Sequence, residues 1–191
     1  MSSKLNRSKR KKKPNYGWMQ SEIDAIGEYQ SRINWMSKMS SRAYTNIKEI
    51  SLWVLHDKFG FGIKRLNRVN EQVRSCVLKN DQAGIKVDHM ILYCKEKMDI
   101  DIYVECKRIP RNARYQIAEI QHPRNTRDMY DYTQAATLAC ALAICMVCTE
   151  LQEIEKFSKK QIRNFVGECI ALINDYIATG YIIQDDVKQI L

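Results

Sequence analysis

The sequence predicts a mostly α-helical protein that folds as a helical bundle. Two observations favour this fold class. Apolar residues recur every three or four positions over long stretches, and the 191 residues include only 7 glycines and 3 prolines. Sheet-rich folds need many turns, whereas long helices need few. Because 45% of the residues are apolar, the chain can build a packed core, as one domain or two small ones.

In the first half of the chain, the pattern predicts four helices. Ser21, followed by Asp24, resembles a capping box and marks the first start. The step Phe59-Gly60-Phe61-Gly62 ends the second helix, and we expect a tight interhelical turn there. The expected helices cover residues 21–41, 44–58, 63–79 and 87–97.

Residues 99–121 differ from this helical pattern. The run from Asp99 to Val104 alternates polar and apolar residues, which is typical of a strand. A turn at 110–112 would let it pair, so we expect a small β-hairpin or an extended segment. The next helix, 127–149, is apolar nearly all round and is expected at the centre of the bundle. Two further helices are expected at 159–178 and 184–191.

The chain contains an internal similarity at an offset of 96 residues. Phe61 aligns with Phe157, and the register continues without a gap to Gly84 and Gly180. The apolar positions Leu66, Val69, Val73, Cys76 and Val77 align with Ile162, Phe165, Cys169, Leu172 and Ile173. Two interpretations remain open: two tandem copies of one helical module, or two amphipathic helices that share only their periodicity.

The similarity suggests a domain organisation. We expect a disordered basic arm at residues 1–17, a first helical module at 18–98, a basic linker or small β-hairpin at 99–127, and a second helical module at 128–191.

The positive charge is concentrated in the arm. Residues 1–16 carry seven cations and no acid, and the rest has 24 Lys and Arg against 22 Asp and Glu. Such a block is typical of an interaction tail, and its natural partner is the phosphate backbone of DNA or RNA. A second basic stretch, 107–127, contains six Lys and Arg against one acid. No aromatic amphipathic face accompanies the arm, so no membrane partner is expected.

These charges predict a non-catalytic nucleic-acid-binding protein without a cofactor. The phosphate-contacting residues would be Lys4, Arg7, Lys9, Arg10, Lys11, Lys12, Lys13, Lys64, Arg65, Arg68, Lys107, Arg108, Arg111 and Arg114. The runner-up is a protein-binding adaptor or inhibitor that captures a host protein or complex. The third hypothesis is a Mg²⁺-dependent nuclease, because Glu105-Cys-Lys107 at the end of the expected strand fits half of a PD-(D/E)xK motif. Asp88, Asp99 or Asp101 would then supply the other metal ligand.

Other candidate motifs have plainer interpretations. The step at residues 59–62 is not a phosphate-binding P-loop, because no strand precedes it and no GK[ST] follows. His56, at a helix end, is interpreted as a capping or core residue rather than as a catalytic base. Cys145 and Cys148 form a CxxC inside the most apolar helix, without further ligands at metal-binding spacing, so buried thiols are expected there.

The seven cysteines and the N-terminus suggest the compartment. Reduced, buried thiols are typical of cytosolic proteins. The N-terminus lacks the apolar segment of a signal peptide. The longest apolar run, 135–148, is too short to cross a bilayer. We expect a cytoplasmic protein.

The segment Leu55-His-Asp-Lys-Phe-Gly-Phe-Gly-Ile-Lys-Arg-Leu66 resembles a motif of short bacteriophage- and prophage-encoded helical proteins of uncharacterised activity. In that family an apolar helix, an LHDxFGFG step and a basic helix follow one another. The match covers about a third of the chain, and the second module lacks the His-Asp pair and both glycines. The resemblance implies a phage setting within a bacterial host cell and no established activity.

Overall fold

The computed structural model describes residues 17–83, 86–120 and 125–179. The chain divides into two compact units, residues 1–35 and 36–191, and the packing contacts and candidate sites described below lie in the second. The described residues form seven α-helices and no strand, so the predicted mostly α-helical bundle is confirmed. The helices are α1 (Gly17–Phe59), α2 (Ile63–Gln82), α3 (Val87–Met98), α4 (Ile102–Lys107), α5 (Arg111–Ile117), α6 (Thr126–Glu153) and α7 (Lys159–Thr179).

Four predicted helices match α2, α3, α6 and α7 to within a few residues. The predicted helix at 184–191 and the arm up to residue 16 lie outside the described residues.

Helix α1 is continuous where two helices were predicted, at 21–41 and 44–58. No glycine or proline lies between Gly27 and Phe59, so nothing breaks the backbone hydrogen bonds. One hydroxyl group near the expected boundary is satisfied inside the helix. Thr45 Oγ1 donates to the Ser41 carbonyl at 3.1 Å. The polar composition around residue 42 was therefore a misleading end signal.

The predicted β-hairpin at 99–121 is wrong, because helices α4 and α5 occupy this segment. Asp99 ends α3 in the left-handed conformation, with φ 57°. Asp101 caps α4, and its side chain accepts the Val104 N–H at 3.2 Å. The two aspartates that created the strand-like alternation are thus helix-capping residues. Both helices pack on α6, so residues 102–117 are part of the helical unit rather than a linker.

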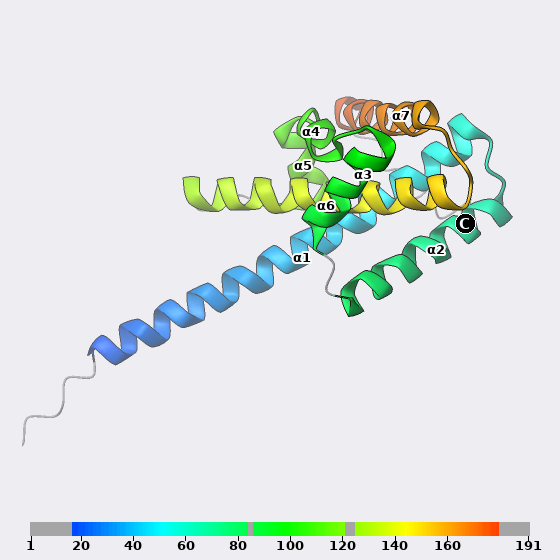
Figure 1. The fold of residues 1–191 in the computed structure, drawn as a ribbon. Coiled ribbons are helices and arrows are strands. Elements are labelled where there is room, and N and C mark those ends of the chain that lie inside the picture. The colour runs from blue at the N-terminus through cyan, green and yellow to red at the C-terminus, as the bar shows by residue number, and fades with distance from the viewer. Residues whose placement is uncertain (1–16, 84–85, 121–124, 180–191) are drawn as a thin grey trace, which may run out of the picture. The chain divides into compact units, whose positions relative to one another are not determined.

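Helix α6 is central, as predicted. It contacts α2, α3, α4, α5 and α7, which surround it in Figure 1. Its residues from Ala135 to Leu151 are buried except Leu138 and Leu142, which are half-buried. By length and composition α6 could also cross a membrane, in contrast to the expectation from its 14-residue apolar run, and 83% of the qualifying stretch is buried in the protein. That burial is the environment of a core helix.

The internal similarity is visible in the backbone. Helices α2 and α7 begin at Ile63 and Lys159, which are 96 residues apart. The α1–α2 turn (residues 59–62) and the α6–α7 turn (residues 154–158) have a left-handed residue at equivalent positions: Gly60 has φ 66° and Lys156 has φ 57°. The next amide donates across each turn, from Phe61 to the Leu55 carbonyl at 3.0 Å and from Phe157 to the Leu151 carbonyl at 2.9 Å.

Phe61 and Phe157 also contact each other. Their ring centroids are 6.0 Å apart in an edge-to-face arrangement. The contact therefore joins the α1–α2 turn to the α6–α7 turn at these two rings.

Candidate nucleic-acid interface

Four predicted phosphate-contacting residues lie on consecutive short helices, which we call the α4–α5 basic surface: Lys107, Arg108, Arg111 and Arg114. Apolar residues between them anchor the two helices, since Ile102, Cys106, Ile109, Ala113 and Ile117 are buried. The periodicity of these anchors turns Lys107, Arg108 and Arg111 toward solvent, and Arg114 is half-buried.

The three exposed cations make weak local contacts. Lys107 Nζ lies 4.3 Å from the centroid of the Tyr103 ring. Arg108 Nη1 donates to Glu105 Oε2 at 2.7 Å. Arg111 Nη1 lies 3.7 Å from Met129 Sδ. Exposed contacts of this kind contribute at most about 1 kcal/mol, so these side chains are free to turn toward a phosphate.

Arg114 is held more firmly. Its Nη1 donates to Thr137 Oγ1 at 2.7 Å, and Thr137 donates in turn to the Thr133 carbonyl at 2.6 Å. The Nε atom of Arg114 is buried and has no acceptor. This guanidinium group is fixed in direction before any ligand arrives.

The predicted residues on α2 have a different role. Arg65 Nε donates to Glu155 Oε2 at 2.5 Å, and Arg68 Nη2 donates to Glu155 Oε1. The Arg65 guanidinium group also lies 3.6 Å from the Phe61 ring centroid. Both arginines are therefore partly neutralised, and they tie α2 to the α6–α7 turn. Lys64, in the first turn of α2, is exposed.

The Glu155 carboxylate is almost fully enclosed, with 3% of its side chain exposed. Burial opposes its ionisation, but the hydrogen bonds from Arg68 and Arg65 outweigh that effect and hold the pKa of Glu155 below its ordinary value. These two ion pairs therefore hold α2 against the α6–α7 turn.

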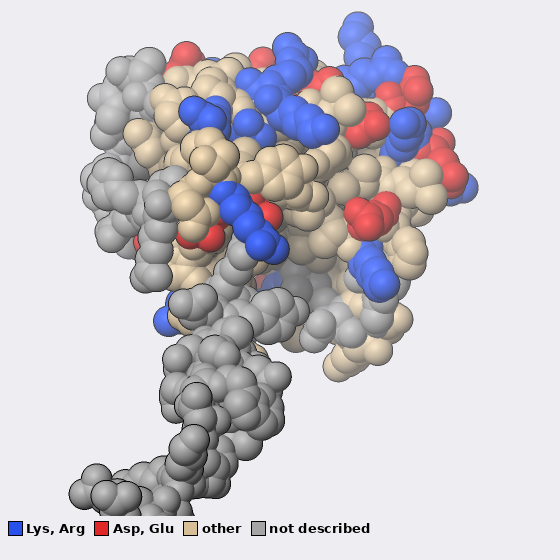
Figure 2. Space-filling model, turned by 90° about the vertical axis from the view of Figure 1, so that its left-hand side faces the viewer, with Lys and Arg blue, Asp and Glu red and all other residues tan. Residues whose placement is uncertain are grey.

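The cations of α2 and those of α4–α5 do not form one surface. Arg65 and Arg68 reach Glu155, just beyond the end of α6, whereas Arg114 reaches Thr137. Roughly 24 Å of helix separate Thr137 from the last residue of α6. Figure 2 shows a face on which Lys and Arg side chains alternate with Asp and Glu. Of the predicted second contact surface, only the α4–α5 basic surface remains a candidate.

The arrangement required for a PD-(D/E)xK nuclease is not assembled in the described residues. Glu105 lies on a helix and pairs with Arg108, Asp101 caps α4, and Asp99 pairs with Arg163. Asp88 is exposed in the first turn of α3. Within the described ranges, no group of three or more His, Cys, Asp and Glu residues is placed to hold a metal ion. The strand on which the motif depends is replaced by α4.

His56 and the glycine step are structural. With its proton on Nδ1, the His56 ring donates to the Phe61 carbonyl at 2.9 Å, which closes the α1–α2 turn. The sequence favoured a capping or core residue; the ring instead bridges the turn to a carbonyl beyond the end of α1, and His56 is exposed.

Six of the seven cysteines are buried: Cys94, Cys106, Cys140, Cys145, Cys148 and Cys169. Burial raises the pKa of Cys140 and of Cys169 to about 12 and that of Cys148 well above its ordinary value. These thiols stay protonated at neutral pH and are poor nucleophiles.

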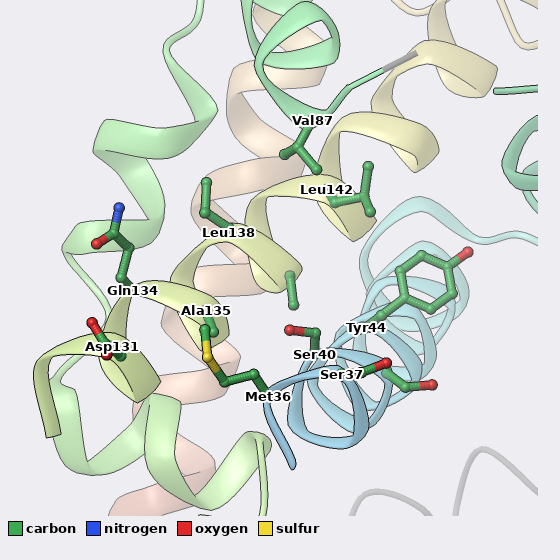
Figure 3. Close-up of a pocket in the computed structure, with 12 residues that line it drawn as sticks. Met36, Ser37, Ser40, Tyr44, Val87, Asp131, Gln134, Ala135, Leu138 and Leu142 are labelled. Atoms are coloured by element: carbon green, nitrogen blue, oxygen red, sulfur yellow. The ribbon is translucent and has the colours of Figure 1, made fainter. Parts of the chain in front are cut away.

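One feature that the sequence did not predict is an open groove of about 840 Å³ between α1 and α6, shown in Figure 3. Because α6 is apolar nearly all round, periodicity could not show which of its residues stay uncovered. The groove is lined by Met36, Ser37, Ser40, Ser41 and Tyr44 from α1, Val87 from α3, and Asp131, Gln134, Ala135, Leu138, Ala139 and Leu142 from α6.

The fold defines an all-α helical bundle. Comparison of the chain with models of protein families, with curated proteins and with solved structures yields no match. The resemblance of residues 55–66 to phage-encoded proteins stays a prediction.

Proposed function

We propose that this protein binds nucleic acid without catalysing a reaction, through its basic arm and the α4–α5 basic surface. The observation that carries the proposal is the charge of residues 1–16, which hold seven of the chain's 31 cations and none of its 22 acids. The exposed Lys107, Arg108 and Arg111 on the body support it. A phage setting and a cytoplasmic location accompany this proposal as expectations from the sequence.

The proposal rests on counterion release. Each phosphate that a cation neutralises frees a condensed counterion, so binding weakens as salt rises. If all seven arm cations meet phosphates on duplex DNA, the slope of log affinity against log salt approaches roughly −6. The three exposed cations of the α4–α5 basic surface would add roughly −3.

The experiment is a salt titration of binding to labelled duplex and single-stranded DNA and RNA. Deleting residues 2–13 should flatten the slope to about −3 or less. Replacing Lys159 and Lys160, exposed in the first turn of α7, by glutamine is the matched control and should leave the slope unchanged. An absence of binding at low salt, with or without the arm, would contradict the proposal.

The groove between α1 and α6 favours a second candidate, a protein-binding adaptor or inhibitor of a host complex. Half-buried Leu138 and Leu142 give it an apolar wall, which suits a helical segment of a partner. A pull-down from host cells with and without nuclease separates the two candidates. A partner retained after nuclease treatment, lost in Leu142→Glu and kept in Leu92→Glu would support this second function, because Leu92 is exposed outside the groove.

A further inference from the structure

Arg114 has no acidic ion-pair partner among the residues that the structure describes. Among the described residues, its guanidinium group donates one hydrogen bond, to Thr137, and has no Asp or Glu oxygen within 4.0 Å. The Nε atom is buried without an acceptor. Arg108 has Glu105 as its partner, and Arg65 and Arg68 share Glu155. Arg114 differs from these arginines because it is both half-buried and unpaired.

The two thiols near Arg114 supply no negative charge. Cys106 and Cys140 are close enough for Arg114 to affect their ionisation, but burial raises the pKa of both thiols and outweighs the opposing effect of the guanidinium. Both thiols therefore stay neutral at pH 7.

The side chain is nevertheless held in place. Thr137 accepts from Arg114 and donates to the Thr133 carbonyl, and the Thr133 hydroxyl lies 2.7 Å from the Tyr115 hydroxyl. Burying a cation without a counter-charge is costly, and native proteins normally pair such a group. A fixed guanidinium group that lacks its anion is the arrangement expected of an anion-binding residue.

We propose that Arg114 is the centre of a phosphate-binding site on the α4–α5 basic surface, with Arg111 one turn earlier on α5 adding positive potential. The ligand class is a phosphate group, because a guanidinium group donates charge-assisted hydrogen bonds to phosphate oxygens. A phosphodiester of a nucleic acid and free phosphate share this chemistry. Binding of a nucleic-acid phosphodiester at this site rests on the proposed function, whereas binding of free phosphate does not.

The first measurement is the thermal stability of the full chain with inorganic phosphate, against chloride at equal ionic strength. Phosphate at tenfold its Kd should raise the Tm of the wild type by about 4 °C. Arg114→Met, which keeps the length of the side chain, should lose this response. Arg74→Met, which removes an exposed arginine of α2, should keep it. An equal phosphate response in all three proteins would overturn the inference.

Phosphate-free buffer separates binding from structure. Because Arg114→Met removes an uncompensated charge, we expect its Tm to equal or exceed that of the wild type. A variant that unfolds or melts well below the wild type would show that the cation serves the fold, and would overturn the inference.

The second measurement is the affinity for a labelled oligonucleotide. Arg114→Met should weaken binding about tenfold, the loss of one charge-assisted contact, and reduce the magnitude of the salt slope by about 1. If the wild type binds no oligonucleotide but shows the Arg114-dependent phosphate response, the anion site stands and the proposed function fails. If oligonucleotide binding and the phosphate response are both unchanged in Arg114→Met, the site fails and the proposed function stands.

Discussion

The α1–α2 turn and the α6–α7 turn share a left-handed residue and the amide hydrogen bond that follows it, but they are built from different residues. Gly60 in the first turn corresponds to Lys156 in the second, and both have positive φ. A Cβ at Gly60 would meet nothing within 4 Å, so glycine is favoured there by φ alone. The second turn tolerates a lysine in the left-handed conformation at a cost of about 1 kcal/mol.

The residue before each following helix also differs. Ser158 caps α7: its Oγ accepts the Gln161 N–H at 3.3 Å, while Gln161 Oε1 accepts the Ser158 N–H at 2.9 Å. Gly62, its counterpart, has no side chain to cap α2. The glycines are thus one of two ways to make the same turn, while a buried phenylalanine is common to both. This comparison identifies the Phe-Gly-Phe-Gly step as a structural turn rather than a phosphate-binding loop.

The two turns differ most at the position before the left-handed residue. Phe59 packs on Phe157 and Phe165, with ring centroids 5.5 Å and 6.1 Å away. Its counterpart Glu155 binds Arg65 and Arg68 instead. The contact at Phe59 is therefore apolar and the contact at Glu155 is ionic, and Arg65 and Arg68 near the start of α2 are paired within the molecule.

The largest expected effect comes from the shared phenylalanines. Phe61 is 1% exposed and Phe157 is 7% exposed, so truncating either removes a ring from the core. We expect Phe61→Ala to lower the free energy of unfolding by about 3–5 kcal/mol, and Phe157→Ala by an amount near the lower end of that range. Urea denaturation of both single variants and the double variant measures the coupling, expected at about 1 kcal/mol. Strict additivity would contradict a direct contact between the two rings.

The next largest effect concerns the ion pairs of Glu155 with Arg65 and Arg68. Glu155→Gln keeps the shape of the side chain and removes its charge, so we expect a loss of about 1.5 kcal/mol at pH 7, at the low end because both arginines are partly exposed. Urea denaturation measures it. Asp99→Asn, in an exposed pair with Arg163, is the control and should cost less than about 1 kcal/mol.

The same variant tests the pKa of Glu155. Since the folded-state pKa lies below the ordinary value, the stabilisation is present above the ordinary Glu pKa of about 4.3 and is lost as pH falls through the folded-state pKa. The stability of the wild type should therefore converge on that of Glu155→Gln in acid. A difference between the two proteins that grows as pH falls would contradict the direction of the pKa shift.

The smallest effect concerns the left-handed residues. Lys156→Gly should stabilise the protein by up to about 1 kcal/mol, because it relieves the positive φ, and Gly60→Ala should destabilise it by a similar amount. Thermal melts of the two variants give opposite shifts if the turns are equivalent. Shifts of the same sign would show that the two turns are governed by different constraints.

The sequence predicted the elements whose signal is long and periodic. Helices α2, α3, α6 and α7 were found because many apolar residues repeat along each, and α6 was recognised as central because it is apolar on all sides. The segment from Asp99 to Val104 was assigned wrongly because six residues are too few to separate a strand from two helix caps. The division of α1 was wrong because serine and threonine side chains can satisfy themselves within a helix.

Of the candidate site, the sequence identified the cations but not their partners. The local sequence does not distinguish Arg65 and Arg68 from Arg114, because each of them lies in a basic stretch. Glu155, about 90 positions from Arg65 along the chain, forms ion pairs with Arg65 and Arg68. Arg114 donates a hydrogen bond to the Thr137 hydroxyl instead. Such contacts depend on how distant helices cross α6, which no local pattern encodes.

The sequence by itself determined the helical class, the central helix, the offset of 96 residues and the concentration of charge in the arm, because each follows from composition or periodicity along the chain. Only the tertiary structure decided which cations are paired, where the α1–α6 groove lies, and that Phe61 meets Phe157. The physical reason is that ion pairing, burial and hydrogen bonding act over a few ångströms in space, between residues that the chain brings together only after its helices have packed.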